Sequence, residues 1–309
     1  MTPRSLICPR CRSADLVEHE TGLRCRSCAA IYSRENGFLA LLRDPGDRFA
    51  DETGCCDHDN EEQSNALTTL SYYMPLWESL KRRWQRAGSP PLKILSAGCG
   101  VGVDVDLHCE HGIDAYGIDC GGRVAHWGRR QQKSRLFIAN VKAVPFGDDS
   151  FDVVKTDCLL PHIGVRGDTT QVCPDYQEQR FEVARELMRV VRPGGLLIMA
   201  NPNRACPVDL FHKSQVGHSR GLGRFHSPSE RFLLAFHDYR KLFIDGCGGA
   251  AIETLPIANF WNFSTMSKAS LGRFVVPVLR GYFALLSLPG LSAIRKSALN
   301  PWLMVAVTK

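Results

Sequence analysis

Two groups of residues in this 309-residue chain have the types and spacing to do chemistry. The first consists of Cys8, Cys11, Cys25 and Cys28, which form two Cys-x2-Cys pairs near the N-terminus. Each pair sets two thiolates on one tight turn, and two such turns can surround a metal ion tetrahedrally. This spacing predicts a structural zinc site that supplies the folding free energy of its module and leaves no open coordination position. Iron and a redox pair are the alternatives that the spacing leaves open.

The second group follows the apolar run 92–95, where the chain reads Ser-Ala-Gly-Cys-Gly-Val-Gly over 96–102. Glycines between a strand and a helix let a ligand approach the backbone where Cβ atoms would collide. Asp119 comes twenty-one residues after Gly98, just past the next apolar run. Its carboxylate can accept hydrogen bonds from both hydroxyls of a ribose. Strand, turn and acid together predict a nucleoside-bearing cofactor.

The elements that must position these residues are apolar runs of strand length, separated by stretches long enough for helices. Such alternation predicts a parallel sheet covered on both faces, that is, a doubly wound, mostly parallel α/β fold. A Pro-Gly-Gly stop at 193–195 ends the helix before the fifth run. The five central runs are 92–95, 115–118, 136–138, 151–156 and 196–200, and 251–255 with 302–307 are expected to close the sheet edge.

We expect three parts along the chain: a zinc ribbon over 1–45, a solvated acidic linker over 46–69, and the α/β domain over 70–309. Insertions at about 202–249 and 256–300 are predicted to be substrate lids. The first insertion holds three histidines whose spacing matches no metal pattern. The domain should begin with an amphipathic helix, because apolar residues recur at helical spacing at Leu70, Tyr73, Trp77, Leu80 and Trp84.

The composition excludes disordered and collagen-like chains, because 44% of the residues are hydrophobic and 23% are charged. The sequence has no apolar run of about 20 residues that could span a membrane, and its start has no signal-peptide core. These features predict a cytoplasmic protein. In that compartment, the thirteen cysteines are expected to be thiols and metal ligands.

The net charge of +6 is uneven along the chain. Residues 1–50 carry eight basic and six acidic residues, and a four-thiolate zinc site would make them near neutral, which argues against a nucleic-acid-binding arm. Residues 201–309 carry thirteen basic and five acidic residues, with no acid after Glu253. The segment 254–309 is therefore either a lid helix packed on the core or a basic amphipathic surface for an anionic or lipid-like substrate or a membrane.

The motifs of the α/β domain resemble the class I S-adenosylmethionine-dependent methyltransferases, in their small-molecule-like branch, over about 92–201. ILSAGCGVG matches the first motif and YGID the second. ANVKAVPFGDDSFDVV matches the adenine-contacting segment, TDCLLPHI the loop beside donor and acceptor, and LMRVVRPGGLLIMANPNR the helix-turn-strand that follows. The N-terminal CPRC and GLRCRSCAAIYSRENGFLALL resemble the zinc ribbon that partners or precedes certain methyltransferases, as activator ribbons do.

This resemblance implies S-adenosylmethionine as the methyl donor. It assigns donor binding to Ser96, Gly98, Cys99, Gly100, Gly102, Asp119, Asn140, Val141 and Thr156. It also makes His162 and Asp157, on the loop beside the donor, the first candidates for acid–base roles, although His162 can equally be a packing or capping residue. The family usually has an acid where Ser96 stands and Asp where Asn140 stands. The amide oxygen of Asn140 can still accept a hydrogen bond from an adenine amino group.

We therefore expect transfer of a methyl group to an O or N atom of a small, partly apolar acceptor, such as a secondary metabolite or a lipid or glycan precursor. Positioning of two reactants can supply about 7–11 kcal/mol of the barrier, so an acid or base is helpful but not obligatory. No DNA partner is expected. Two alternatives stay open: an RNA methyltransferase guided by the ribbon, and a non-catalytic binding or activator protein that retains the fold.

Overall fold

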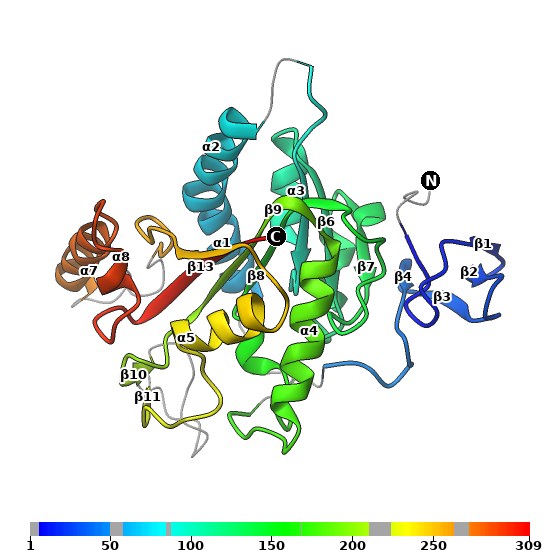
Figure 1. Cartoon of the computed structure of the whole chain (residues 1–309). Coiled ribbons are helices and arrows are strands. Elements are labelled where there is room, and N and C mark those ends of the chain that lie inside the picture. Colours follow the sequence, from blue (N-terminus) through cyan, green and yellow to red (C-terminus); the bar gives the residue numbers. More distant parts are fainter. Residues whose placement is uncertain (1–5, 50–57, 85–87, 168, 210–223, 263–271) are drawn as a thin grey trace.

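The computed structural model describes residues 6–49, 58–84, 88–167, 169–209, 224–262 and 272–309 (Figure 1). Its central feature is an eleven-stranded sheet that contains every strand predicted from the apolar runs. The strands from β7 to β9 are parallel, and β13 runs antiparallel to both β9 and β12. In spatial order these strands are β7 (Leu136–Ile138), β6 (Asp114–Asp119), β5 (Lys93–Ala97), β8 (Phe151–Asp157), β9 (Val191–Pro202), β13 (Trp302–Thr308) and β12 (Ala251–Thr254).

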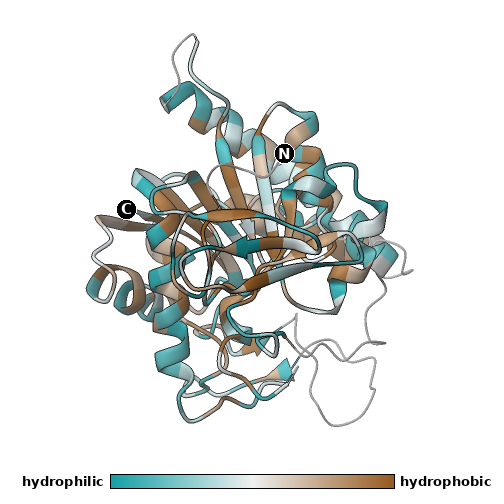
Figure 2. Cartoon of the chain, turned by 90° about the vertical axis from the view of Figure 1, so that its right-hand side faces the viewer, coloured by the Kyte–Doolittle hydropathy of each residue, from teal (hydrophilic) through white to brown (hydrophobic). Residues whose placement is uncertain are grey.

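Helices cover both faces of this sheet, as a doubly wound fold requires. Successive strand residues point to opposite faces, so Ile94 and Val153 join one apolar core while Leu95 and Val154 join the other. Figure 2 shows hydrophobic residues gathered on the central strands and hydrophilic residues on the outer helices and turns. The first core packs against α2 (Met74–Trp84) and α3 (Val103–Glu110), and the second against α4 (Tyr176–Val190), α5 (Phe236–Tyr239) and the π turn η5 (Arg240–Asp245).

The N-terminal cysteine-containing segment continues the sheet directly. It forms an antiparallel meander of β1 (Leu16–His19), β2 (Gly22–Cys25), β3 (Ile31–Glu35) and β4 (Phe38–Ala40). Strand β4 then pairs in parallel with β7, with Leu39 opposite Phe137. An ion pair of 2.5 Å between Arg12 and Glu186 also ties the segment to α4. The segment is therefore built into the domain and not merely tethered to it.

The segment 46–69, expected to be a solvated linker, is instead helical from residue 58 onward, although 46–49 are irregular as expected. Helix α1 (His58–Thr68) carries carboxylates that pair with arginines of the 3-10 helix η2 (Gly122–Arg129) and of its C-terminal end. The prediction was wrong because it weighed only local charge, whereas the partners lie more than sixty residues away. The pairs are Asp59 with Arg129 at 2.9 Å, Glu61 with Arg123 at 2.8 Å and Glu62 with Arg130 at 2.5 Å.

The amphipathic helix predicted from Leu70 is divided into the π turn η1 (Thr69–Tyr73) and α2. Tyr73, Trp77 and Leu80 are buried as expected, but Leu70 is 42% exposed. A π turn holds more residues than an α-helical turn, so it rotates the helix face that precedes it. Leu70 consequently falls off the apolar stripe that the periodicity assigned to it.

The insertions predicted as lids differ in their packing. In the first, Phe232, Tyr239 and Phe243 are buried in the core. Two of its three histidines, at positions 212 and 218, lie outside the described residues. The second contains α7 (Gly272–Leu286) and α8 (Ser292–Arg295). Within the part of the chain that the structure describes, no helix is long and apolar enough to cross a membrane. The remaining short elements are β10 (Val208–Asp209), β11 (Arg224–Phe225), η3 (Lys133–Arg135) and η4 (Leu160–His162).

Candidate active site

A cavity of about 570 Å³ opens at the carboxyl ends of the parallel strands, next to the glycine-rich turn. This is the edge of an open α/β sheet at which ligands generally bind. Most of the residues predicted to contact the cofactor or the acceptor line it: Gly98, Cys99, Gly100, Asp119, Asn140, Val141, Asp157 and His162. Residues from the segment after the ribbon, from α1 and from the C-terminal insertion line it as well, including Asp47, Phe49, Glu61, Phe260 and Trp261.

The glycine turn needs its glycines for two different reasons. Gly98 and Gly100 both have positive φ, of +75° and +54°, and both line the cavity. A Cβ on Gly98 would lie 3.2 Å from the Leu159 side chain. Gly102, also predicted to bind the donor, is not among the residues that line the cavity. Gly102 also has positive φ, +73°, and a Cβ there would lie 3.2 Å from Leu136, so Gly102 serves the close packing of the start of α3 against β7.

Asp119 stands at the end of β6 and faces the same cavity. Its Oδ2 accepts a hydrogen bond of 2.8 Å from the Gly100 amide, and its Oδ1 accepts one of 2.8 Å from the Gly121 amide. These bonds hold the carboxylate beside the glycine turn. Each carboxylate oxygen can accept a further bond, so the group can still receive the hydroxyls of a ribose.

Ser96 does not reach the cavity. It is 2% exposed, and its Oγ donates a 2.6 Å hydrogen bond to Oδ2 of Asp104, in the first turn of α3. Asp104 itself lines the cavity. The acidic charge absent at position 96 is thus present nearby on another element. Sequence reasoning missed Asp104, although an acid in the first turn after a glycine loop was the available signal.

Lys155 joins Asp104 to the predicted acid–base residue Asp157. Its Nζ lies 2.9 Å from an Asp104 oxygen and 3.0 Å from an Asp157 oxygen. Burial lowers the pKa of Lys155, but the two carboxylates outweigh it and hold that pKa above its ordinary value. Burial likewise raises the pKa of Asp104, and Lys155 overcomes this to leave it lowered. The cavity floor therefore carries a charged buried triad that the sequence did not predict.

The π turn η1 adds Tyr73 to this triad. The Tyr73 hydroxyl donates a hydrogen bond to Oδ1 of Asp157, and the Lys155 Nζ lies 4.7 Å from the Tyr73 ring centroid. Both carboxylate oxygens of Asp157 therefore already accept hydrogen bonds. Thr156, predicted to bind the donor, is absent from the cavity lining and is 1% exposed. Strand alternation explains this, since β8 turns residues 155 and 157 toward the cavity and 156 away from it.

His162 lies at the other side of the cavity, in the short η4 turn after β8. Its ring meets Phe49 and Phe232 edge-on, with centroid distances of 5.9 and 5.5 Å. The buried Arg180 of α4 donates hydrogen bonds of 3.3 Å to the carbonyls on either side of it, those of Pro161 and Ile163. Burial of this guanidinium lowers the pKa of Arg180 to about 10. Arg180 thus positions the loop that carries His162.

Asn140 is held by the segment that follows the ribbon. Its Nδ2 donates bonds of 2.9 and 3.1 Å to the side chain and backbone carbonyl of Asp47, and its Oδ1 accepts one of 2.9 Å from the Lys142 amide. The amide oxygen expected to serve adenine is therefore already engaged once. Burial raises the pKa of Asp47. No local signal in the sequence marked Asp47, because the connection spans 93 residues.

Aromatic side chains form one wall of the cavity. Tyr73, Phe260, Trp261 and Trp302 all line it. Phe260 lies 6.2 Å from Tyr73 and 5.2 Å from Trp261 between ring centroids, and Trp261 meets Trp302 edge-on at 4.7 Å. Such a wall suits a flat, partly apolar molecule.

The four cysteines predicted as metal ligands come together at the N-terminus, away from the cavity. Their Sγ atoms all lie within 4.8 Å of one another, with Cys8 and Cys28 at 3.6 Å and Cys11 and Cys25 at 3.5 Å. Tetrahedral zinc with Zn–S bonds of about 2.3 Å requires sulfurs about 3.8 Å apart. The four thiols thus fit a zinc-sized cation.

The protonation of these thiols also suits a cation. Burial acts against the Cys8 thiolate, yet the Tyr32 hydroxyl, 2.9 Å from its Sγ, and nearby backbone amides lower its pKa to about 7. A backbone hydrogen bond from Ser13 favours the Cys11 thiolate, but desolvation and the other three thiols raise its pKa to about 12. Crowded sulfurs cannot all ionise without a positive charge among them.

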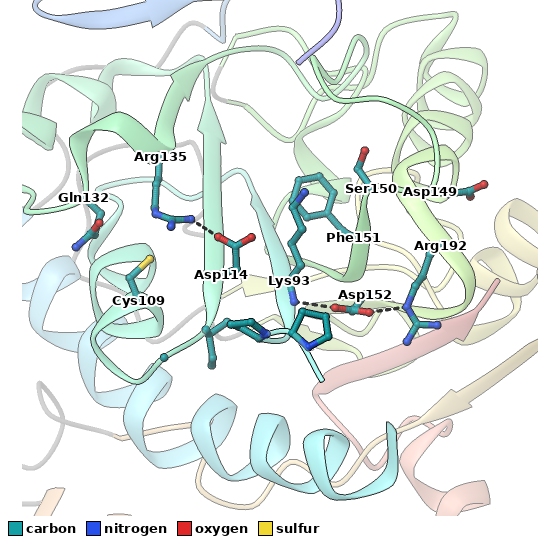
Figure 3. A pocket seen from close by; sticks show the side chains of 14 residues that line it. Lys93, Cys109, Asp114, Gln132, Arg135, Asp149, Ser150, Phe151, Asp152 and Arg192 are labelled. Carbon is teal, nitrogen blue, oxygen red and sulfur yellow. Dashed lines mark hydrogen bonds and ion pairs between the residues drawn. The ribbon is translucent and has the colours of Figure 1, made fainter. Parts of the chain in front are cut away.

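A second hollow, of about 620 Å³, lies at the opposite, amino-terminal ends of the strands (Figure 3). Its charged groups are already matched. Asp114 pairs with Arg135, and Asp152 accepts hydrogen bonds from the Arg192 side chain and the Lys93 amide. The Lys93 ammonium lies over the Phe151 ring at 5.2 Å. The hollow holds no predicted site residue, so the chemistry belongs to the cavity at the carboxyl ends.

Sheet order, glycine turn and strand-end acid define a Rossmann-like domain for a nucleoside-bearing ligand. Comparison with known proteins is more specific, because residues 95–199 match the family model described as "Methyltransferase domain". This region is a methyltransferase domain of the S-adenosylmethionine-dependent class.

Three curated relatives agree with this assignment. The demethylmenaquinone methyltransferase of Renibacterium salmoninarum is 29% identical over 38% of this chain and 47% of its own length. A probable S-adenosylmethionine-dependent methyltransferase of Mycolicibacterium smegmatis is 28% identical over 40% and 46%. The 2-methyl-6-phytyl-1,4-hydroquinone methyltransferase of Synechocystis is 28% identical over 40% and 37%. The chain thus spans less than half the length of each of these relatives.

Proposed function

We propose that this protein transfers a methyl group from S-adenosylmethionine to an O or N atom of a small, flat and partly apolar acceptor. The observation that carries the proposal is that the glycine turn, Asp119 and an aromatic wall line one and the same cavity. Two of the relatives are named for substrates of quinone or hydroquinone type. An aromatic ring of that kind is the acceptor class that this wall favours.

The residues at the glycine turn fit the donor. The carboxylate of Asp119 would receive the ribose hydroxyls, and the main chain at Gly98 and Gly100 would lie against the donor's tail. Asn140 and Val141 would flank the adenine. Asp104 would attract the ammonium of the methionine moiety, because its carboxylate supplies the negative charge that Ser96 lacks. When bound, the donor supplies an electrophilic methyl group.

On the acceptor side, the chain's contribution is chiefly positioning. The aromatic wall would orient the acceptor ring, and well-oriented reactants gain about 7–11 kcal/mol over free ones. His162 and Asp157 border this space from two sides. Because Asp157 is already bonded to Tyr73 and Lys155, we propose His162 as the group that accepts a proton from a phenol or amine.

We also propose that residues 1–45 form a zinc ribbon held by Cys8, Cys11, Cys25 and Cys28. Support comes from the spacing of the four Sγ atoms, which suits a tetrahedral cation. With four sulfur ligands, this metal would be structural.

The donor site can be tested by calorimetry with S-adenosylmethionine and S-adenosylhomocysteine. Asp119→Ala should weaken binding about 10- to 150-fold, the loss of one charge-assisted hydrogen bond or more. Asp114→Ala is the matched control, since it removes an acid from the other end of the same strand, where it pairs with Arg135. Unchanged affinity in Asp119→Ala, or no binding by the native protein, would contradict the proposal.

A further inference from the structure

Helix α7 is apolar on two opposite faces. Its inner face is buried, and Phe283 and Leu286 belong to the same core as Trp302 of the cavity wall. Its outer face exposes Phe274, Val278 and Leu285, whose side chains are 65%, 70% and 53% exposed. Residues four and seven positions apart lie along one stripe of a helix. A surface helix of an isolated globular domain ordinarily carries polar residues on that stripe.

Neighbouring residues extend this exposed surface. Leu288 follows the helix and is exposed. Leu299 is exposed as well, and its carbonyl accepts a hydrogen bond from the hydroxyl of Tyr282 on α7. We call Phe274, Val278, Leu285, Leu288 and Leu299 the α7 patch. Figure 1 shows α7 and α8 beyond β13, at the end of the molecule opposite the β1–β4 meander. The α7 patch therefore lies far from the β1–β4 meander.

The charge of the surrounding segment has one sign. From Thr254 to Lys309 the chain carries six Lys or Arg and no Asp or Glu. Three of the six have other partners: Arg295 is buried, Lys296 lies over the Phe236 ring, and Lys309 pairs with Asp149. Arg280 lies on α7 itself, is exposed, and has its Nη2 3.4 Å from the Asn262 carbonyl. Two more basic residues, Lys268 and Arg273, stand close before it in the sequence. An apolar stripe in a segment whose charged residues are all basic is complementary to a lipid surface, which has anionic headgroups over an apolar interior.

We propose that the α7 patch docks on the surface of a membrane that contains anionic lipids, with α7 lying in the plane of the interface. The helix has 15 residues, about 22 Å at 1.5 Å per residue, which is too short to span a bilayer core of about 30 Å. A second copy of the chain is a poorer occupant. A symmetric contact would set the same basic segment against itself.

This orientation has a bearing on the proposed function. The Ser287 Oγ, just after α7, accepts hydrogen bonds of 3.0 and 2.8 Å from the amides of Ile257 and Ala258. Those residues lead directly into Phe260 and Trp261 of the aromatic wall. A docked α7 would hold that wall near the bilayer, within reach of an acceptor dissolved in lipid. Only the delivery of a lipid-dissolved acceptor to the aromatic wall rests on the proposed methyl transfer, because membrane docking itself requires no methyl transfer.

The test is flotation of the full-length protein with vesicles of phosphatidylcholine alone and of equal parts phosphatidylcholine and phosphatidylglycerol. We expect binding to the mixed vesicles that weakens with added salt. The double variant Phe274→Ser/Val278→Ser should bind them at least about tenfold more weakly, because two exposed apolar side chains no longer enter the interface. Arg280→Gln should weaken binding about fivefold on mixed vesicles and leave binding to phosphatidylcholine unchanged.

Phe225→Ser is the matched control, since Phe225 is an exposed phenylalanine outside the α7 patch, on β11. It should bind like the native protein. Equal flotation of native and double-variant protein would overturn the proposal, as would failure of the native protein to float with mixed vesicles. Sedimentation that shows a native dimer and a monomeric double variant would assign the α7 patch to a second copy instead.

Titration of the same preparations with S-adenosylhomocysteine, without vesicles, separates the two proposals. Membrane docking predicts that the double variant binds it with native affinity. If the native protein binds S-adenosylhomocysteine but not vesicles, the docking proposal is refuted and the proposed methyl transfer is not. A native protein that floats but binds no S-adenosylhomocysteine refutes the proposed methyl transfer and leaves docking supported.

Discussion

The hydroxyl of Tyr73 donates a hydrogen bond to the carboxylate of Asp157, and so joins the π turn before α2 to the end of β8. Through Lys155 the contact continues to Asp104 and Ser96. One network of hydrogen bonds and ion pairs thus joins η1, β8, α3 and β5, and Tyr73, Asp104, Lys155 and Asp157 of this network line the cavity.

Tyr73→Phe should destabilise the protein by about 1.5–3 kcal/mol, because it removes a hydrogen bond to a charged, half-buried carboxylate. The neighbouring Tyr72→Phe removes a hydrogen bond of 2.6 Å to the neutral Pro256 carbonyl and should cost about 0.5–1.5 kcal/mol. Denaturant unfolding of both variants measures the difference. Equal losses would mean that the bond to Asp157 has no charge-assisted character.

Asp104→Asn should lower the affinity for S-adenosylmethionine about 10- to 150-fold, since it removes the negative charge placed beside Ser96. It should also destabilise the protein by about 3–5 kcal/mol, because the buried Lys155 loses its buried carboxylate partner and keeps only the half-buried Asp157. Asp106→Asn is the control. Asp106 is buried on the same helix and accepts bonds from the Gln131 and Gln132 amides, but does not line the cavity. If both variants bind the donor equally weakly, Asp104 acts only through stability.

Removal of the proposed zinc should affect both the proposed ribbon and the proposed donor site. We expect Cys25→Ser to release zinc, measured by metal analysis, and to weaken donor binding about tenfold, because Asp47 after the ribbon would no longer hold Asn140. Cys247→Ser, a half-buried cysteine near α4, should change neither quantity. Native donor affinity in a metal-free protein would show that the Asp47 segment is held independently of the ribbon.

Stability should fall in mild acid because of His108. Burial lowers its pKa from 6.5 to about 3, and its Nε2 accepts a 2.9 Å hydrogen bond from Trp77. Below pH 6.5 the His108 side chain therefore binds a proton in the unfolded chain but not in the folded one. The contribution of neutral His108 to the free energy of unfolding is thus complete above pH 6.5 and is lost as the pH falls toward 3. From about pH 7 to about pH 5 the loss should be about 2 kcal/mol.

Urea unfolding at both pH values checks this. His108→Gln should reduce the acid loss by that amount, whereas His111→Gln, at the exposed end of the same helix, should not. An identical acid loss in native and His108→Gln protein would assign the pH dependence to other groups.

The periodic features of the sequence predicted the fold well. All seven apolar runs are strands, in one largely parallel sheet, because burial on both faces leaves a continuous apolar signal. The sequence also predicted the positions of the glycine turn and of Asp119 beside it, since a positive φ and an acid at a strand end are local requirements.

The features that the sequence did not reveal depend on contacts between distant segments. Ser96 and Thr156 matched their motif positions but do not line the cavity. Strand alternation turns Thr156 to the other face of the sheet, whereas Ser96 lies on the face of Lys155 and is buried behind its hydrogen bond to Asp104. Asp104, Lys155 and Tyr73 came together only through the packing of three elements. The acidic helix α1 was misjudged for the same reason, because its arginine partners lie far along the chain.

The parallel pairing of β4 with β7 also has a bearing on solubility. Strand β7 would otherwise end the sheet with a row of unsatisfied amides and carbonyls, which is a template for aggregation. The meander shields that border and presents in its place β1, a short outermost strand that bears a glutamate and a histidine. Loss of the proposed zinc would therefore do more than unfold the meander. It would expose the β7 border of the sheet to other chains.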